Sequence, residues 1–221
     1  MPTALITGAS SGIGAAIAAV LAPGYRLLLA GRPSDRLAAV AQSLDAVIWP
    51  VELTQVGDLA TRADLPDELD VLVHNAGVAW PGRVDESTDQ QWRTTMEVNV
   101  LGAVTLTRAL LPALRRASGQ VVFINSGSGL RVLPGMASYS ASKFALRAFA
   151  DALRGEEPTL RVTTIHPGRT DTAMQRDVVA YEGGSYDPAR FLSAETVAGV
   201  VANVLATPPD GHIHEVVIRP R

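Results

Sequence analysis

The chain has 221 residues, of which 47% are hydrophobic and 19% are charged, and its formal net charge is -3. This length suits a single domain with a substantial core, here expected over residues 1–221, and the small negative charge provides no basic field to bind nucleic acid or a membrane surface. The absence of cysteine excludes disulfides, thiolate metal sites and cysteine nucleophiles.

Seven short apolar runs are separated mostly by segments long enough for a helix. The runs span residues 4–7, 26–30, 46–49, 71–73, 121–125, 162–165 and 215–218. This alternation indicates βαβ units, and the lack of polar alternation within the runs is typical of strands covered on both faces. The sequence therefore predicts an α/β fold, with a seven-stranded parallel sheet flanked by helices on both faces.

Helices are expected at residues 12–21, 89–116, 138–153 and 194–205, and after Ser34, which is placed to cap a helix through Leu37 and Val40. Residues 54–70 leave room for only a short helix, and residues 181–190, rich in glycine and acidic residues, predict a loop. No apolar stretch approaches the roughly 20 residues that span a bilayer, and no charged signal-peptide opening follows Met1. We therefore expect a soluble, cytoplasmic protein without a membrane partner.

A glycine-rich segment, Thr7-Gly8-Ala9-Ser10-Ser11-Gly12-Ile13-Gly14, links the first expected strand to the first helix. Glycine lets the backbone turn tightly and approach a pyrophosphate, and a helix N-terminus offers free N–H groups and the positive end of its dipole. An ordinary strand-turn-helix connection is the alternative. The order of strand, glycines and helix favours a dinucleotide site.

The end of the second expected strand indicates which dinucleotide binds. A carboxylate there would bind the ribose hydroxyls of NAD, whereas an arginine would accept the 2′-phosphate of NADP. The sequence has Gly31 and Arg32 at this position and no acidic residue. We expect NADP(H) to be preferred, with NAD possible; the alternative is that Arg32 is a solvated loop residue.

Lys143 is the only lysine in the chain, since every other basic residue is arginine. It follows Tyr139 by four residues, a spacing that places both side chains on one face of a helix. An ammonium group close to the tyrosine favours the phenolate and can hold a sugar hydroxyl at the same time, which suits it better than a planar guanidinium. The pair predicts an acid/base site. The alternative is that a single lysine remains by chance in an arginine-rich sequence.

Five groups of residues appear in the order and spacing of one protein family. They are Thr7-Gly8-x-x-x-Gly12-x-Gly14, Asn75-Ala76-Gly77, Asn99 with Ser126, Tyr139-x-x-x-Lys143, and Pro167-Gly168-x-x-x-Thr172. In these residues the chain resembles the short-chain dehydrogenase/reductase family over nearly its whole length. The resemblance implies a doubly wound, Rossmann-like sheet with the active site at the carboxyl ends of the strands.

The resemblance also implies a role for each matched residue. Tyr139 would be the acid/base, and Lys143 would bind the nicotinamide ribose and lower the tyrosine pKa. Ser126 would hydrogen-bond the substrate oxygen, and Asn99 would hold the water that links Lys143 to solvent. Thr172 would face the nicotinamide carboxamide. The expected cofactor-binding residues are Gly8, Ser10, Ser11, Gly12, Ile13, Gly14, Arg32, Glu52, Leu53, Asn75, Ala76, Gly77, Tyr139, Lys143, Pro167, Gly168, Thr170 and Thr172.

These residue types fit carbonyl reduction. A free tyrosine, with a pKa of about 10, is almost fully protonated at neutral pH, so moving protons in both directions requires a cation close by. NADPH would give hydride to the carbonyl carbon, Tyr139 would give a proton to its oxygen, and Ser126 would stabilise the developing oxyanion. Ser128 is an alternative to Ser126 because both lie on one flexible turn, and Asn99 could instead be an amide that bends its helix.

The chain departs from the family pattern in three places. His74 stands where the family often has asparagine, and we expect a packed imidazole there. Glu52 replaces an aspartate near the adenine, so that contact is expected to be lengthened or lost. No basic residue precedes Gly12, which leaves Arg32 as the only expected 2′-phosphate ligand. The remaining histidines, His166, His212 and His214, lack ligand spacing, so no metal site is predicted.

The residues expected around the substrate carbonyl are mostly apolar, with Arg169 as the only nearby cation. They are Trp80, Ser126, Gly127, Leu130, Leu133, Tyr139, Met174, Val178, Tyr181 and Phe191. This lining favours a small or medium apolar ketone, aldehyde or alcohol. A carboxylate-bearing substrate paired with Arg169 is the alternative.

The sequence as a whole predicts an NADP(H)-dependent oxidoreductase that interconverts a carbonyl and an alcohol. Two alternatives remain open, a nucleotide-binding sensor or scaffold without turnover, and an epimerase or dehydratase with a tightly held cofactor. The helices at 89–116 and 138–153 resemble those through which the family forms dimers and tetramers. We therefore expect a homodimer or homotetramer.

Overall fold

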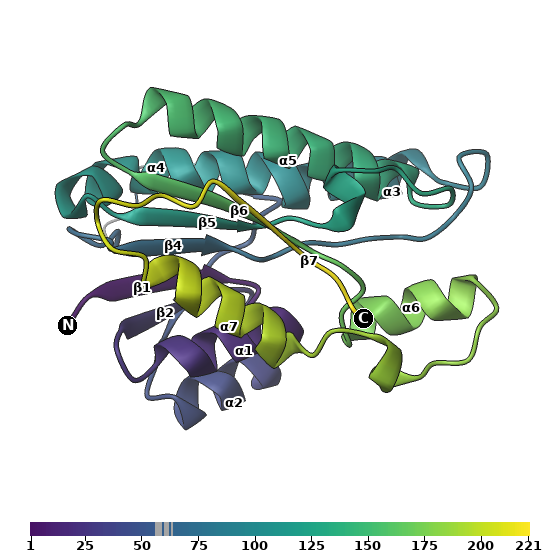
Figure 1. The fold of residues 1–221 in the computed structure, drawn as a ribbon, viewed down its shortest axis with the longest axis horizontal. Coiled ribbons are helices and arrows are strands. Elements are labelled where there is room, and N and C mark those ends of the chain that lie inside the picture. Colours follow the sequence, from purple (N-terminus) through teal and green to yellow (C-terminus); the bar gives the residue numbers. More distant parts are fainter. Residues whose placement is uncertain (56–58, 60–61, 63) are drawn as a thin grey trace.

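The computed structural model describes residues 1–55, 59, 62 and 64–221, which fold around one seven-stranded sheet (Figure 1). All strands are parallel, in the order β3-β2-β1-β4-β5-β6-β7. They are β1 (Thr3–Thr7), β2 (Arg26–Gly31), β3 (Val47–Pro50), β4 (Val71–His74), β5 (Gln120–Ile124), β6 (Arg161–Pro167) and β7 (Glu215–Ile218). The predicted α/β, doubly wound fold is confirmed.

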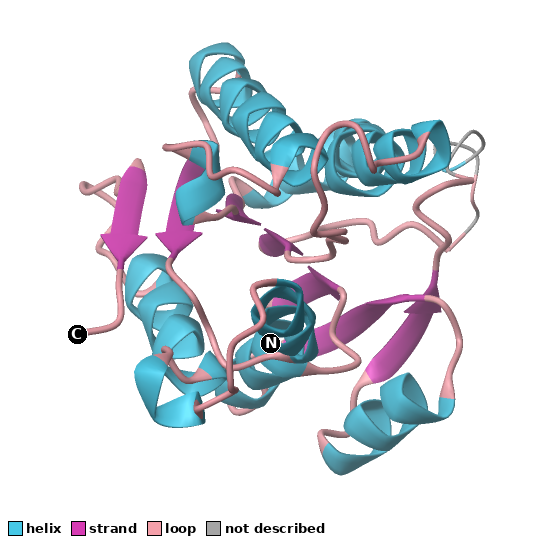
Figure 2. Cartoon of the chain, turned by 90° about the vertical axis from the view of Figure 1, so that its right-hand side faces the viewer, coloured by secondary structure: helices cyan, strands magenta, loops and turns pink. Residues whose placement is uncertain are grey.

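Helices cover both faces of the sheet. They are α1 (Gly12–Leu21), α2 (Asp35–Ser43), α3 (Asp89–Met96), α4 (Gly102–Ala117), α5 (Ala137–Glu156), α6 (Ala173–Tyr181) and α7 (Ala194–Leu205). In Figure 1, α1, α2 and α7 lie on one face, and α3, α4 and α5 lie on the other. Helix α6 lies apart from both layers, beyond the carboxyl ends of the strands, and Figure 2 views the molecule from that side.

The strand order reverses at β1, which lies between β2 and β4. The chain lays down β1, β2 and β3 in one direction and then crosses back to place β4 on the other side of β1. In open parallel sheets, ligands bind outside the carboxyl ends of the strands at such a reversal. The glycine-rich segment 8–14 follows β1 directly, so it lies at this point.

The hydrophobic core is divided into two layers by the sheet. Successive side chains of a strand point to opposite faces, so Phe123 packs with the α4 and α5 layer whereas its neighbour Ile124 packs with the α1 and α7 layer. Leu5 and Ile6 of β1 divide in the same way. Burial on both faces explains why these strands read as continuous apolar runs in the sequence.

The long helix predicted at residues 89–116 is present but interrupted. It begins at Thr88, whose hydroxyl accepts from the backbone N–H of Gln91 in a capping box. A π-helical turn, Glu97–Leu101, then separates α3 from α4 and contains Asn99. Such turns insert one extra residue into a helix and often occur at functional sites.

Two further expectations are changed by the structure. Residues 173–181 form α6, which the sequence analysis did not identify as a helix, so the loop predicted at 181–190 begins only after it and includes a short 3-10 turn, Pro188–Arg190. The short helix expected between residues 54 and 70 falls partly on positions 56–58, 60, 61 and 63, which lie outside the described residues.

Among the described helices, one continuous stretch, Asp89–Ala117, is long and apolar enough to cross a membrane by length and composition alone. The expectation that no apolar stretch reaches this length is therefore wrong. Of its most apolar window, 56% is buried inside the fold, and Leu106, Leu110 and Leu114 are fully buried on the side facing the sheet. Contact with the sheet accounts for the apolar face, as in a core helix.

Candidate active site

Tyr139 and Lys143 lie one turn apart on α5 and are both buried, with exposed fractions of 9% and 3%. The Lys143 Nζ lies 5.6 Å from the centre of the Tyr139 ring, as the spacing predicted. The amine also donates a 3.0 Å hydrogen bond to the carbonyl oxygen of Ile124, the last residue of β5. The only lysine of the chain is therefore held between the end of a central strand and the tyrosine.

Burial changes the acidity of both groups. Desolvation lowers the pKa of Lys143 from 10.5 to about 8, because the charged amine is disfavoured away from water. Burial likewise raises the pKa of Tyr139, and a side-chain hydrogen bond with Ser126 acts in the opposite direction. The expected lowering of the Tyr139 pKa by Lys143 is not found in this structure, where Ser126 is the group that favours the phenolate.

Ser126 follows β5 and faces Tyr139. Its backbone N–H donates to Asn125 Oδ1 at 2.8 Å, and its Oγ accepts from the backbone N–H of Ser128 at 3.1 Å. Ser128, the alternative serine, therefore contributes its backbone N–H to the turn. The hydroxyl of Ser126 is the one that lowers the pKa of the Tyr139 phenol. This arrangement favours Ser126 over Ser128 as the substrate-facing hydroxyl.

Asn125 belongs to the same site, although the sequence analysis did not select it. Its Nδ2 donates a 3.0 Å hydrogen bond to the backbone carbonyl of Lys143, and its Oδ1 accepts from Ser126. Gly129 lies directly against Oδ1, where a Cβ would collide with it. One buried amide therefore fixes the end of β5 to the turn of α5 that carries the lysine. The available signal was an asparagine at the end of a buried strand, directly before the serine.

Asn99 is buried in the π-helical turn. Its Oδ1 accepts from the backbone N–H of Val78 at 2.8 Å, and its Nδ2 donates to the Val78 carbonyl and to Ser142 Oγ, both at 2.9 Å. Ser142 in turn donates to the Tyr139 carbonyl at 2.7 Å. The implied role for Asn99 was to hold a water near Lys143. Its side chain joins the segment after β4 to α5, the water-holding role stays a prediction, and the interrupted helix agrees with the bending alternative.

Gly77 lies between Asn99 and Lys143. A Cβ on Gly77 would be 3.3 Å from Asn99 Oδ1 and 3.8 Å from Lys143 Nζ. The predicted 75–77 segment is thus beside the buried amine.

The glycine-rich loop is tied to this segment by Thr7 and Asn75. Thr7 Oγ1 accepts from the backbone N–H groups of Asn75, at 2.9 Å, and Ala76, at 3.0 Å. Asn75 Nδ2 donates to the carbonyls of Thr7, at 3.0 Å, and Gly8, at 3.1 Å. Gly14 packs on the carbonyl of Gly8, where a side chain would collide with the backbone. The sequence predicted that Asn75 lines the adenine-ribose side of the cofactor site. In the structure its side chain stabilises the glycine-rich loop through these hydrogen bonds.

The N-terminus of α1 lacks a side-chain cap, because Ser11 makes no capping hydrogen bond. By contrast, the N-cap hydroxyls of α2, α3, α6 and α7 all accept from backbone N–H groups. Gly8 and Gly12 have φ values of +67° and +54°, which favour glycine. The first-turn amides of α1, next to Ser10, Gly12 and Ile13, are therefore free of side-chain acceptors, which suits a pyrophosphate.

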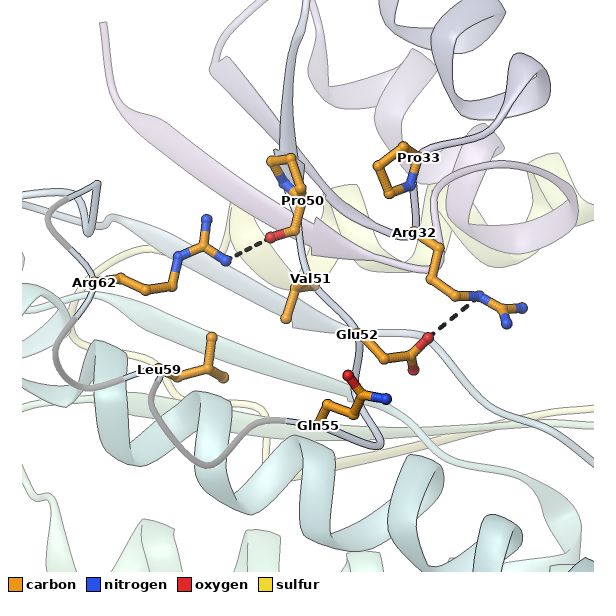
Figure 3. A pocket seen from close by; sticks show the side chains of 8 residues that line it. All are labelled: Arg32, Pro33, Pro50, Val51, Glu52, Gln55, Leu59 and Arg62. Atoms are coloured by element: carbon orange, nitrogen blue, oxygen red, sulfur yellow. Dashed lines mark hydrogen bonds and ion pairs between the residues drawn. The ribbon is translucent and has the colours of Figure 1, made fainter.

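Arg32 lies at the end of β2 and lines a pocket of about 320 Å³ beside β3 (Figure 3). Its side chain is 81% exposed, and its Nε lies 3.7 Å from Glu52 Oε2. Arg62 lines the same pocket, but its guanidinium is paired with Asp64 and donates to the carbonyl of Pro50, so Arg32 stays the expected 2′-phosphate ligand. Glu52 is directed toward Arg32, an arrangement that the sequence did not predict. Leu53 packs against Gly102 at the start of α4.

The segment after β6 reaches the glycine-rich loop. A Cβ on Gly12 would be 3.3 Å from Thr172 Cγ2, and Thr172 Oγ1 accepts from the backbone N–H of Gln175 to cap α6. Thr170 donates to the carbonyl of Gly168 at 3.1 Å. Residues 167–172, predicted to contact the nicotinamide, therefore cross from β6 toward the end of β1.

The residues expected around the substrate lie on three segments that meet. The backbone N–H of Gly82, close to Trp80, donates to the carbonyl of Gly135 at 2.9 Å. Tyr181 packs against Gly135, where a Cβ would be 2.9 Å from the ring. Leu133 lies on the middle segment and is exposed. No interaction in the described residues joins Trp80, Leu133 or Met174 to Tyr139, so their contact with substrate stays a prediction.

The expectation that Arg169 is the only cation near the substrate is wrong. Arg169 forms a 2.6 Å ion pair with Glu182 and lies 5.4 Å from the ring centre of Phe191. The guanidinium of Arg219 lies against Gly127, next to Ser126. Position 219 follows the last strand and is distant in sequence from every matched motif, so the sequence offered no sign of this contact.

The histidines are packed or lie close to one or two polar groups, and His166 Nε2 lies 3.5 Å from Glu215 Oε1. His74 Nε2 lies 2.8 Å from Thr107 Oγ1, and burial lowers the His74 pKa to about 3, as suits a packed neutral imidazole. His166 Nδ1 lies 3.1 Å from the Ser126 carbonyl, and His212 Nε2 lies 3.0 Å from the Val162 carbonyl. His214 packs edge-on against His212. Within the described residues, no group of three histidine or acidic side chains is arranged to hold a metal ion.

Comparison with known proteins identifies the family. The family model described as "short chain dehydrogenase" matches residues 2–183. The chain belongs to the short-chain dehydrogenase/reductase family. It is 32% identical to an uncharacterized oxidoreductase of Staphylococcus epidermidis, over 98% of this chain and 96% of that protein.

Two solved structures of the family are especially similar. An alcohol dehydrogenase from the archaeon Thermococcus sibiricus, complexed with 5-hydroxy-NADP, has a TM-score of 0.90 and 29% identity, covering 100% of this chain and 97% of that chain. A putative short chain dehydrogenase from Escherichia coli, complexed with NADPH, has a TM-score of 0.88 and 29% identity, covering 99% and 95%. The chain is therefore an oxidoreductase of this family, and the likeness supports NADP binding.

Proposed function

We propose that this protein interconverts a ketone or aldehyde and the corresponding alcohol, with NADP(H) as the hydride carrier and Tyr139 as the acid/base. The observation that supports this most is the group formed by the buried Tyr139 and Lys143 with the half-buried Ser126. Asn125, at the end of β5, and Asn99, in the π-helical turn, hold α5 against the segments that follow β5 and β4. The group lies at the carboxyl edge of the sheet, where ligands of such folds bind.

Ser126, Tyr139 and Lys143 would have separate roles in moving the proton. The Ser126 hydroxyl would donate a hydrogen bond to the substrate oxygen, and the Tyr139 hydroxyl would give that oxygen its proton during reduction. Because the pKa of Tyr139 is raised by burial, the phenol keeps its proton until a substrate oxygen gaining negative charge requires it. In the oxidative direction, a positive charge on Lys143 would favour the phenolate that accepts the proton back.

The residues at the ends of β1 and β2 fit a dinucleotide. The uncapped first turn of α1 would bind the pyrophosphate, and Gly8 and Gly12 allow the backbone to approach it. Lys143, beside Gly77, would hold the nicotinamide ribose. When bound, NADPH supplies the hydride, and Thr172, lying against Gly12, would face the nicotinamide carboxamide.

Preference for NADP(H) over NAD(H) is supported by Arg32, at the pocket beside β2 and β3. Arg32 is largely exposed and can turn toward a 2′-phosphate, whereas Arg62 in the same pocket is paired with Asp64. The two similar structures described above hold NADP-type nucleotides. Glu52, placed beside Arg32, opposes this preference and would make it incomplete.

Assembly into a homodimer or homotetramer, and a cytoplasmic location, are further parts of this proposal. Leu101, at the junction of α3 and α4, and Phe144, on α5, are large apolar side chains exposed on the helices expected to form the subunit contact. A shared helical interface would cover them.

Consumption of NADPH against a panel of ketones and aldehydes tests the proposal. We expect stoichiometric oxidation with at least one carbonyl, and loss of turnover in Tyr139→Phe with nearly unchanged NADPH binding. Wild-type turnover in that variant would refute the assigned chemistry. If NADPH binds but no carbonyl consumes it, the protein is instead a sensor or scaffold, and conversion of a sugar or alcohol without net cofactor use would indicate an epimerase or dehydratase.

A further inference from the structure

The segment after β7 brings an arginine into the active site. The strands β6 and β7 end level with one another, Pro167 pairing with Ile218, and the backbone N–H of Gly168 donates to the carbonyl of Ile218 at 2.7 Å. Figure 1 places this end of the chain at the edge of the sheet close to α6. Arg219 therefore starts beside the loop that is proposed to contact the nicotinamide.

The side chain of Arg219 then extends from Gly168, in the segment after β6, to Gly127, in the turn after β5. A Cβ on Gly168 would be 3.3 Å from Arg219 Cδ, and a Cβ on Gly127 would be 3.1 Å from Cζ and 3.3 Å from Nη2. It would be closer still to Nη1. Glycine at both positions leaves room for the side chain, and the guanidinium rests on the residue that directly follows Ser126.

The acidic side chains around this path are paired with other arginines. Asp171 pairs with Arg176 at 3.2 Å, Glu182 pairs with Arg169 at 2.6 Å, and Glu215 pairs with Arg147 at 2.8 Å.

No carboxylate in the described part of the chain forms an ion pair with Arg219, and no hydrogen bond there uses its side chain. Its guanidinium presents N–H donors in a planar fork that matches a carboxylate.

We propose that Arg219 binds the carboxylate of a short oxo acid whose carbonyl is held by Ser126 and Tyr139. This inference rests on the proposed function and narrows its substrate. Adjacent Cα atoms are about 3.8 Å apart, so a guanidinium on Gly127 suits an anionic group within one or two carbons of the carbonyl. In the reaction, the carbonyl carbon accepts hydride from NADPH and the oxygen accepts the Tyr139 proton, which yields the hydroxy acid and NADP⁺ while Arg219 stays charged.

A matched pair of substrates tests the inference. Acetoacetate and methyl acetoacetate carry the same ketone and differ in the charge that Arg219 would bind. We expect the wild-type enzyme to prefer the acid, and Arg219→Gln to lower kcat/KM for the acid by about tenfold or more, as loss of a charged hydrogen bond implies, with the ester changed less than about twofold. Arg219→Lys should restore part of the preference, and Arg221→Gln, two residues away, should leave it unchanged.

Two results would overturn the inference, namely equal losses for acid and ester in Arg219→Gln, or a wild-type enzyme that favours the ester. Either result would leave the proposed function intact, because the ester would still be reduced.

A second measurement separates the inference from turnover. In the presence of NADP⁺, which cannot give hydride, calorimetry should detect acetoacetate binding to the wild-type protein and a loss of at least about tenfold in affinity in Arg219→Gln. Binding of methyl acetoacetate should be equal in the two proteins. If no carbonyl is reduced in the first experiment, the proposed function fails while this titration still decides whether Arg219 binds the carboxylate. Equal acetoacetate affinities in the two proteins would refute it.

Discussion

The side-chain amide of Asn125 donates a 3.0 Å hydrogen bond to the backbone carbonyl of Lys143. The same amide accepts from the backbone N–H of Ser126 at 2.8 Å. A single side chain at the end of β5 therefore sets the distance between the serine that faces the substrate and the helix turn that carries the lysine. In the part of the chain that the structure describes, the Asn125 side chain forms no hydrogen bond with Tyr139, so we assign it a positioning role.

Replacing Asn125 by alanine should reduce turnover more than cofactor binding. We expect Asn125→Ala to lower kcat by about tenfold or more, since the loss of buried hydrogen bonds costs about 1–3 kcal/mol and frees both partners to move. The dissociation constant for NADPH should change little, because the glycine loop is held by Thr7 and Asn75. Asn203→Ala, on exposed α7 surface, is the matched control. A variant with lowered thermal stability but normal kcat would show that Asn125 is only structural.

The buried amine of Lys143 should make the protein less stable at neutral pH than it would be without the charge. Its pKa is about 8 in the folded state and about 10.5 when exposed. Below pH 8 Lys143 is protonated in both the folded and the unfolded state, so the full cost of burying its charge lowers the stability. Between pH 8 and 10.5 only the unfolded state holds it, so the contribution of Lys143 to stability rises with pH.

Lys143→Met should therefore raise the free energy of unfolding at pH 7 by about 2 kcal/mol, after allowance for the lost hydrogen bond to Ile124, while abolishing turnover. The difference in the free energy of unfolding between Lys143→Met and the wild-type protein should decrease between pH 8 and 10. Denaturant unfolding at several pH values measures this difference. Arg108→Met, an exposed substitution on α4, should show no such trend, because a guanidinium stays charged throughout this range. A gain that is constant from pH 7 to 10 would contradict the assignment.

The sequence predicted the strands and most helices because burial on both faces leaves continuous apolar runs, and because glycine and cap residues mark the turns. It also predicted that Tyr139 and Lys143 share one face, since helical spacing alone decides this. Residues whose partners are near in sequence, or fixed by strand pairing, were the predictable part of the site.

The rest depends on contacts between distant segments. Asn125 becomes part of the site only when β5 meets α5, and Arg219 reaches Gly127 only because β7 pairs with β6. The π-helical turn at Asn99 changes no apolar spacing strongly enough to be noticed in the sequence. The raised pKa of Tyr139 follows from burial of its side chain, which a motif does not report.

Reversing the charge at position 32 should change the preferred cofactor. In Arg32→Asp, a carboxylate would repel the 2′-phosphate of NADPH and could accept hydrogen bonds from the ribose hydroxyls of NADH. We expect the ratio of kcat/KM for NADPH to that for NADH to fall by about tenfold or more, since charged hydrogen bonds contribute about 1.5–3 kcal/mol. Arg36→Asp, exposed on the neighbouring helix α2, is the control. An unchanged ratio would indicate that Arg32 is merely solvated and that Arg62 or the backbone selects the cofactor.

Removing the negative charge beside Arg32 should have the opposite effect. Glu52 Oε2 lies 3.7 Å from Arg32 Nε, while its Oε1 accepts from the backbone N–H and hydroxyl of Thr54. Glu52→Gln retains an oxygen for Thr54 and releases Arg32, so NADPH affinity should increase by up to about fivefold, within the range of an exposed ion pair, and NADH affinity should change less. The difference should diminish at high salt. Glu156→Gln, at the far end of α5, should alter neither affinity, and weaker NADPH binding in Glu52→Gln would show that the carboxylate supports the cofactor instead of opposing it.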